Sequence, residues 1–175
     1  MLTERRAADF DFDALYDALD AKRRALGMTW QQATRAVNEL FRNVPARPIS
    51  ASTLTGLRGR RALEGNGVLQ MLLWLERTPE SFSQRSERVR FDDALPRVGP
   101  SQILRFDTPA LHAALDAQRG ERGMMWREVA AEIGQLNPAS LTRLAEGGRV
   151  GFPDVMRIVR WLDRPVASFT RGFNR

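Results

Sequence analysis

The sequence contains an internal repeat, and this duplication constrains the fold more than any other feature. Residues 10–30, FDFDALYDALDAKRRALGMTW, match residues 106–126, FDTPALHAALDAQRGERGMMW, at an offset of 96 positions. Further along, residues 54–57 match residues 141–144 at an offset of 87. The first copy therefore carries nine extra residues between these two blocks. The chain is a tandem duplication of one structural unit.

Each copy has about 70 residues, which is small but enough to fold alone. Apolar residues recur at helical spacing in both copies, so we expect an all-α fold with four to five helices in each. The stretch between the copies contains Pro96, Gly99 and Pro100 and is interpreted as a linker. Short extended pieces are expected near 89–91 and 103–104, with part of the linker packing between the units. The predicted division is a flexible arm at 1–9, a first helical domain at 10–84, a linker at 85–105 and a second domain at 106–175.

Composition narrows the classes of function. The chain has 27 Lys and Arg residues against 21 Asp and Glu, a net charge of +6, which favours a polyanionic partner. However, Lys22 is the only lysine, and so many arginines also fit a GC-rich coding sequence. The absence of cysteine excludes disulfides and thiolate metal sites. The longest apolar run, 68–75, is too short to span a bilayer, so a soluble cytoplasmic protein is expected.

No set of catalytic residues is evident in the sequence. The only histidine, His112, has no neighbouring nucleophile or ligand pair and is expected on the surface or in packing. The glycines at 65 and 67 are interpreted as a turn rather than a phosphate-binding loop. We therefore predict no enzyme activity, no metal and no cofactor.

The segment 137–149, NPASLTRLAEGGR, is typical of a short, exposed helix. Asn137 is a good N-cap, Leu141 and Leu144 give one apolar stripe, and the glycines at 147–148 provide a stop. The helix is about two turns long, too short to be stable by itself. Its outward residues are small or end in a hydroxyl or guanidinium group, and such a face suits the edge of a base pair: Ala139, Ser140, Thr142 and Arg143.

This order of helices, with the short helix third, is that of a helix-turn-helix domain. The second copy resembles the Cro/cI family, also called lambda-repressor-like or XRE. The resemblance rests on the glycine before helix two, the apolar run ending in a glycine at 129–134, the serine-to-glycine core at 140–147 and the final Trp-Leu-Asp at 161–163. It extends over essentially all of both copies, which makes the chain similar to a tandem-repeat member of that family.

The resemblance implies that helix three enters the DNA major groove and that the start of helix two contacts phosphate. Arg143 is the strongest base reader, since guanidinium can bridge two acceptors of guanine, whereas its counterpart Gly56 can read nothing. The implied base-reading residues are Ser52, Thr53, Thr55, Ala139, Ser140, Thr142 and Arg143. The implied phosphate contacts are Gln31, Arg42, Arg47, Arg58, Arg60, Arg61, Arg127 and Arg149.

We therefore expect a sequence-specific regulator of transcription, with repression preferred, that binds double-stranded DNA at two unlike half-sites. A dimer of such chains is a further possibility. The alternative is a helical protein-interaction module, similar to an antitoxin or an inhibitory subunit, that binds a protein partner. A compromise between the two is that the second repeat reads DNA while the first holds a protein partner or a second chain. The nine-residue excess leaves two outcomes open. It adds phosphate contacts through Arg42 and Arg47, or it moves helix three away from the groove.

Overall fold

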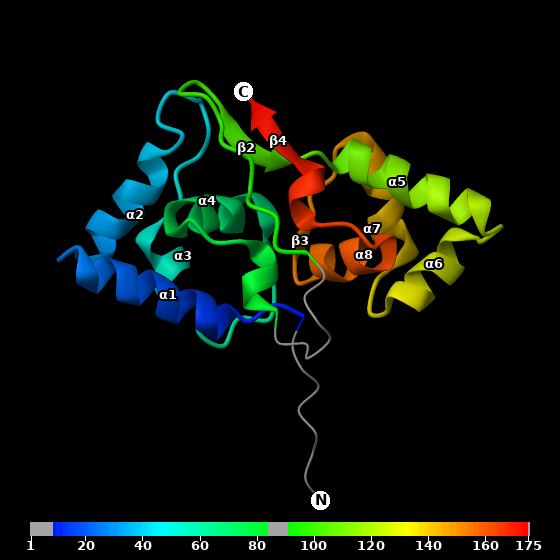
Figure 1. The fold of residues 1–175 in the computed structure, drawn as a ribbon, viewed down its shortest axis with the longest axis horizontal. Coiled ribbons are helices and arrows are strands. Elements are labelled where there is room, and N and C mark those ends of the chain that lie inside the picture. Colours follow the sequence, from blue (N-terminus) through cyan, green and yellow to red (C-terminus); the bar gives the residue numbers. More distant parts are fainter. Residues whose placement is uncertain (1–8, 84–90, 175) are drawn as a thin grey trace, which may run out of the picture.

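The computed structural model of the chain describes residues 9–83 and 91–174 (Figure 1). The first repeat contains α1 (Phe12–Ala25), α2 (Trp30–Glu39), α3 (Ala51–Thr55), β1 (Leu63–Glu64), α4 (Gly65–Leu75) and the 3₁₀ helix η1 (Pro79–Phe82). The strand β2 (Ile103–Phe106) follows the linker. The second repeat contains α5 (Thr108–Glu121), α6 (Trp126–Ile133), α7 (Pro138–Thr142), η2 (Arg143–Glu146), β3 (Gly151–Phe152), α8 (Asp154–Leu162), η3 (Val166–Phe169) and β4 (Thr170–Phe173).

The prediction of an all-α fold is wrong, because the helices are joined by two small antiparallel sheets of two strands each. β1 pairs with β3, and β2 pairs with β4. The extended piece expected at 103–104 is part of β2, whereas Phe91 lies in no strand and residues 89–90 lie outside the described residues. The strands are two to four residues long, too short to show a clear alternation of apolar and polar residues.

Equivalent side chains make the same local contacts in both repeats. Asp11 accepts a hydrogen bond from the Ala14 amide at 2.9 Å, and Asp107 accepts one from Ala110 at 3.1 Å, so each aspartate caps the first helix of its repeat. The last turn of the same helix is fixed by an arginine: Arg23 donates to the Met28 carbonyl and Arg119 to that of Met124, both at 2.9 Å. The two copies therefore share local hydrogen bonds as well as sequence.

The two repeats are related by an approximate half-turn. In Figure 1, rotation by half a turn in the plane of the picture exchanges α1 with α5, α2 with α6, and α4 with α8. β1 and β3 meet on the same axis, since Glu64 pairs with Gly151, its own equivalent at the offset of 87. We call this axis the pseudo-dyad. It gives the chain the arrangement of a symmetric dimer within one polypeptide.

One hydrophobic core is shared by both repeats. Phe152 of β3 is fully buried, with its ring centroid 4.6 Å from that of Phe10 and 5.9 Å from that of Phe106. Its equivalent in the first repeat is Gly65, where an added Cβ would lie 2.7 Å from a ring carbon of Phe106. The Phe106 ring thus lies near Phe152 of the second copy and also against its glycine equivalent in the first.

Polar contacts also cross between the repeats. Asp9, almost buried, accepts hydrogen bonds from Arg157 and Arg160 of α8, both at 2.7 Å. It belongs to the predicted flexible arm, whose residues 1–8 lie outside the described residues. Glu80 of η1 accepts a hydrogen bond from the Val166 amide at 2.8 Å, and burial raises the pKa of this carboxyl.

Within residues 9–83 and 91–174, no helix is long and apolar enough to cross a bilayer.

Candidate nucleic-acid interface

The short helices α3 and α7 occupy equivalent positions in the two repeats. Leu54 and Leu57 are fully buried in the first repeat, and Leu141 and Leu144 are only 1% and 2% exposed in the second. α7 and η2 together form the short helix expected from the sequence, which stops at Gly147 with φ +79°. Because the leucines hold one side of each helix against the core, the other side faces solvent.

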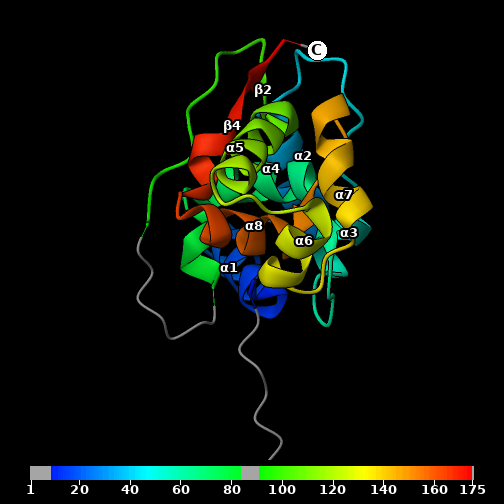
Figure 2. The same cartoon turned by 90° about the vertical axis from the view of Figure 1, so that its right-hand side faces the viewer.

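Both short helices lie on one face of the molecule. Figure 2 shows α3 and α7 along the same edge, with the green segment that leads to β2 on the opposite edge. This edge is the far side of the molecule in Figure 1, so the pseudo-dyad runs perpendicular to it. One face therefore presents two short helices related by a half-turn.

The predicted base-reading side chains are exposed on this face, except for Thr53, which is half-buried. The Thr55 hydroxyl donates to the Ala51 carbonyl at 3.2 Å, and the Thr142 hydroxyl donates to the Ala139 carbonyl at 3.1 Å. Each hydroxyl hydrogen is thus used within its own helix. The oxygens remain free to accept hydrogen bonds, which suits the amino groups of adenine or cytosine in the major groove.

The start of α3 carries a small cluster of hydroxyl groups. Ser50 Oγ lies 3.0 Å from Ser52 Oγ and 2.9 Å from Thr53 Oγ1. The half-buried Thr53 is thereby tied to the residue that precedes the helix. In the second repeat Asn137 accepts a hydrogen bond from the Ala139 amide at 2.9 Å. The Arg143 side chain is exposed, with no hydrogen-bond or ion-pair partner among the described residues.

The extra residues of the first repeat make α2 two residues longer than α6 and lengthen the following connection from four residues to eleven, 40–50. This loop is closed at its base. The Asn38 amide nitrogen donates to the Ile49 carbonyl, and the Ile49 amide donates to the Asn38 side-chain oxygen, both at 2.9 Å. The chain leaves α2 and returns at the same place, so α3 keeps the position that α7 has in the second repeat. Of the two outcomes left open by the sequence, displacement of the third helix does not occur.

The tip of this loop packs against the second repeat's strands. Phe41 and Val44 are buried in a separate small cluster with Ile103 of β2, and Phe173 of β4 packs on it. The Asn43 side chain donates to the Pro100 carbonyl at 3.1 Å. The loop is therefore fixed at its tip as well as at its base.

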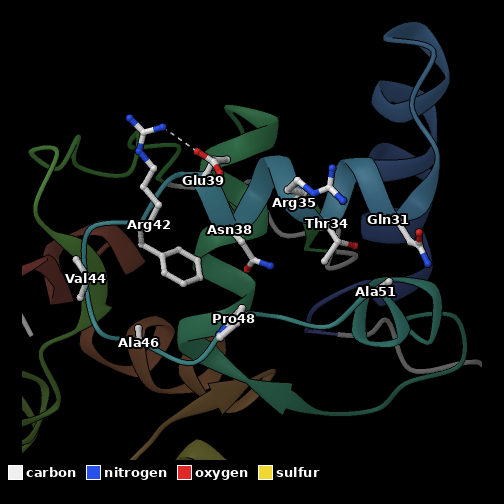
Figure 3. A pocket seen from close by; sticks show the side chains of 11 residues that line it. Gln31, Thr34, Arg35, Asn38, Glu39, Arg42, Val44, Ala46, Pro48 and Ala51 are labelled. Atoms are coloured by element: carbon white, nitrogen blue, oxygen red, sulfur yellow. Dashed lines mark hydrogen bonds and ion pairs between the residues drawn. The ribbon is translucent and has the colours of Figure 1, made fainter.

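A cavity of about 480 Å³ lies between α2 and the loop (Figure 3). Gln31 and Arg35 line it from α2, and Arg42 reaches Glu39 with 3.0 Å between nitrogen and oxygen. Arg35 is not among the residues predicted from the sequence. Its position four residues after Gln31 places it on the same side of α2, and that spacing is a signal from which it could have been found.

The predicted phosphate contacts differ in whether their side chains already have partners within the protein. Arg58 pairs with Asp17 of α1 at 2.5 Å and lies over the Tyr16 ring, 4.5 Å from its centroid. Its guanidinium is partly engaged, although the pair is exposed and weak. Gln31 and Arg47 are exposed. Four others are exposed and have no ion-pair partner among the described residues: Arg60, Arg61, Arg127 and Arg149.

The tryptophans that begin α2 and α6 pack against the first helix of their repeats. The Trp30 ring lies 5.1 Å from the Tyr16 ring, and the Trp126 ring stacks on His112 at 5.0 Å. Arg23 and Arg119 cover the same two indoles. His112 thus takes the packing role expected of it.

Comparisons with protein-family models, with curated proteins and with solved structures found no significant match.

Proposed function

We propose that the chain is a sequence-specific regulator of transcription that binds double-stranded DNA with α3 and α7. The observation that carries this proposal is the pseudo-dyad perpendicular to the face on which both helices lie. Two recognition helices related by a half-turn match the local symmetry of a duplex and enter successive major grooves on one side of it. The protein works in the cytoplasm, without catalysis, and blocks transcription by occupying its site.

The chemistry of the face supports this assignment. α3 presents hydroxyl groups. The short helix formed by α7 and η2 adds Arg143, whose guanidinium can bridge N7 and O6 of guanine. The turns that follow α3 and η2 carry Arg60, Arg61 and Arg149, which suit phosphates. Because the two reading surfaces differ, the preferred site has two unlike half-sites.

The distribution of exposed apolar side chains favours DNA over a protein partner. Among the described residues, the large exposed apolar side chains are Leu26, Leu40 and Met125, and none belongs to α3, α7 or η2. A face that docks a protein normally carries an apolar centre. The interaction-module alternative therefore has less support.

The test is selection of bound duplexes from a random library, at near-physiological salt, followed by sequencing. We expect two unequal, inverted half-sites whose centres lie about one helical turn apart. Arg143→Ala removes the preference at one base pair of one half-site, at about 1–3 kcal/mol. Arg97→Ala is the matched control, because Arg97 is exposed on the linker and its loss changes the net charge equally.

Two results would contradict the proposal. Weak retention of all sequences that disappears with added salt indicates charge attraction only. Equal selectivity of the Arg143→Ala variant and the wild type excludes the second repeat as the reader of bases.

A further inference from the structure

The outer end of the first repeat carries apolar side chains that are exposed to solvent. Leu26, in the turn after α1, is 53% exposed, and Leu40, which follows the last residue of α2, is 39% exposed. Met28 and Ala36 line a hollow of about 510 Å³ beside Leu26, between this turn and α2. Figure 1 places the turn at the end of the first repeat that lies away from the second repeat. We call the surface formed by these four residues the α2 outer face.

The fold does not require this apolar surface, because the second repeat has charged residues at the equivalent positions. Leu26 and Ala36 correspond to Arg122 and Glu132 at the offset of 96. Arg122 and Glu132 form an exposed ion pair, with 2.8 Å between nitrogen and oxygen, and Glu132 also accepts from the Trp161 indole at 2.9 Å. α2 and α6 nevertheless occupy equivalent places in their repeats. Apolar side chains that the same unit replaces by charges, and that gather around a hollow, indicate an interaction surface.

The charges beside the α2 outer face are complementary to themselves. Arg35 and Glu39 are four residues apart on α2, and both line the hollow. Arg35 is exposed and has no hydrogen-bond or ion-pair partner among residues 9–83 and 91–174. Glu39 gives one carboxylate oxygen to Arg42 at 3.0 Å, in an exposed and therefore weak pair. A second α2 running antiparallel to the first brings each Arg35 beside the Glu39 of the other chain, which is the pairing that a two-fold contact requires.

We propose that the α2 outer face binds the same face of a second copy of this chain, with the two α2 helices antiparallel about a two-fold axis. The beginning of each helix, beside Leu26, then lies next to the end of the other, which carries Leu40. Ala36 lies near the axis, where its small side chain lets the helices approach closely. Each chain contributes one helix and one turn, which is typical of a weak, reversible dimer. The contact involves no DNA and therefore goes beyond the proposed function.

The dimer can be trapped covalently, because the chain contains no cysteine of its own. Ala36→Cys introduces a single thiol near the two-fold axis, within reach of the same thiol in the other chain. Ala131→Cys is the matched control, since Ala131 is exposed on α6 at the position equivalent to Arg35. Both full-length variants are oxidised at one protein concentration and followed by non-reducing electrophoresis, and unfolding midpoints establish that each is folded. We expect Ala36→Cys to cross-link at least about tenfold faster, although its site is half-buried and that of the control is exposed.

Further substitutions in the Ala36→Cys chain test how the two helices are arranged. Arg35→Glu places like charges opposite each other and should slow cross-linking about threefold or more. Combining it with Glu39→Arg exchanges the two charges and should restore the rate. Leu26→Gln with Leu40→Gln removes apolar contacts at two exposed sites and should lower the rate to that of the Ala131→Cys control.

Equal rates in the two cysteine variants would overturn the proposal, and this is the result expected if the α2 outer face binds a different protein instead. A charge exchange that stays as slow as Arg35→Glu alone would also overturn it, since the helices then do not lie antiparallel. So would leucine variants that react as fast as their parent. All these measurements are made without DNA. A chain that cross-links through Ala36→Cys but selects no DNA sequence refutes the proposed function and leaves the dimer intact.

Discussion

The two repeats bring their third helix to the same place by different connections. In the second repeat α6 is followed by residues 134–137, with Gly134 at φ +90° and Gln135 at φ +57°. In the first repeat residues 40–50 intervene, and Asn38 closes the loop through Ile49. The short connection of the second repeat depends on positive φ angles. The long connection of the first repeat is held instead by the Asn38 side chain, which bonds both backbone groups of Ile49. A long insertion is thus tolerated where hydrogen bonds close its base.

At the pseudo-dyad the two repeats differ in that Phe152 of the second has Gly65 as its equivalent in the first. Phe152→Ala opens a cavity between Phe10 and Phe106, and we expect it to lower the free energy of unfolding by about 3–5 kcal/mol. Urea denaturation measures the change. Phe173→Ala, at a half-buried site in the other sheet, is the control with a smaller effect. Equal losses in the two variants would mean that the repeats do not depend on a shared core.

Asn38→Ala breaks the closure of the loop in the first repeat. It removes two hydrogen bonds and leaves both backbone groups of Ile49 without their partner, at a cost of about 2–3 kcal/mol. Hydrogen exchange should accelerate in α3 and stay unchanged in α7. Asn43→Ala removes the contact of the exposed loop tip with Pro100 and serves as the control. Unchanged exchange in α3 would show that Asn38 does not position this helix.

Gly134→Ala tests the short connection of the second repeat. The φ of +90° is unfavourable for a residue with a Cβ, so we expect a loss of about 1–2 kcal/mol in thermal or urea unfolding. Gly120→Ala, in α5, has open space around the added carbon and should instead stabilise by about 0.5–1 kcal/mol. A stabilising Gly134→Ala would indicate a different backbone at this turn.

The smallest effect concerns Glu80, whose equivalent in the second repeat is Ala167. Burial raises the pKa of Glu80 above its ordinary 4.5, so the unfolded chain releases this proton at lower pH than the folded chain. The contribution to stability is complete below 4.5 and is lost as pH rises through the folded pKa. Glu80→Gln should therefore raise the urea midpoint at neutral pH and leave it little changed at acid pH. Glu39→Gln, at an exposed site, should alter neither value.

Much of the helical framework could be predicted because its signals are local. The N-cap expected at Asn137 forms, with a hydrogen bond of 2.9 Å from the Ala139 amide. Gly147 ends the short helix as its position indicates, and Leu141 and Leu144, the predicted apolar stripe, are buried. Each of these features depends on residues within a few positions of one another, which a single sequence displays directly.

The pairing of the strands could not be predicted, because it depends on residues that are far apart in the chain. Leu63 meets Phe152, and Arg105 meets Arg171, without any local pattern that announces the pairing. The hydrogen bonds between Asn38 and Ile49 could not be predicted either, since an asparagine near the end of a helix does not indicate which residue its side chain will bond. The sequence indicates that the outward residues of α3 and α7 form a face, whereas only the fold brings Arg35 together with the loop 40–50.

The shared core also has a consequence for synthesis on the ribosome. Phe10 and Asp9 are made early, yet their partners Phe152 and Arg157 are made much later. Until those residues leave the exit tunnel, the nascent first repeat cannot bury its apolar edge and must avoid association with other chains. A stalled or truncated product ending before β3 should therefore be a ready target for chaperones and proteases. Translation of the second repeat completes the folding of the first.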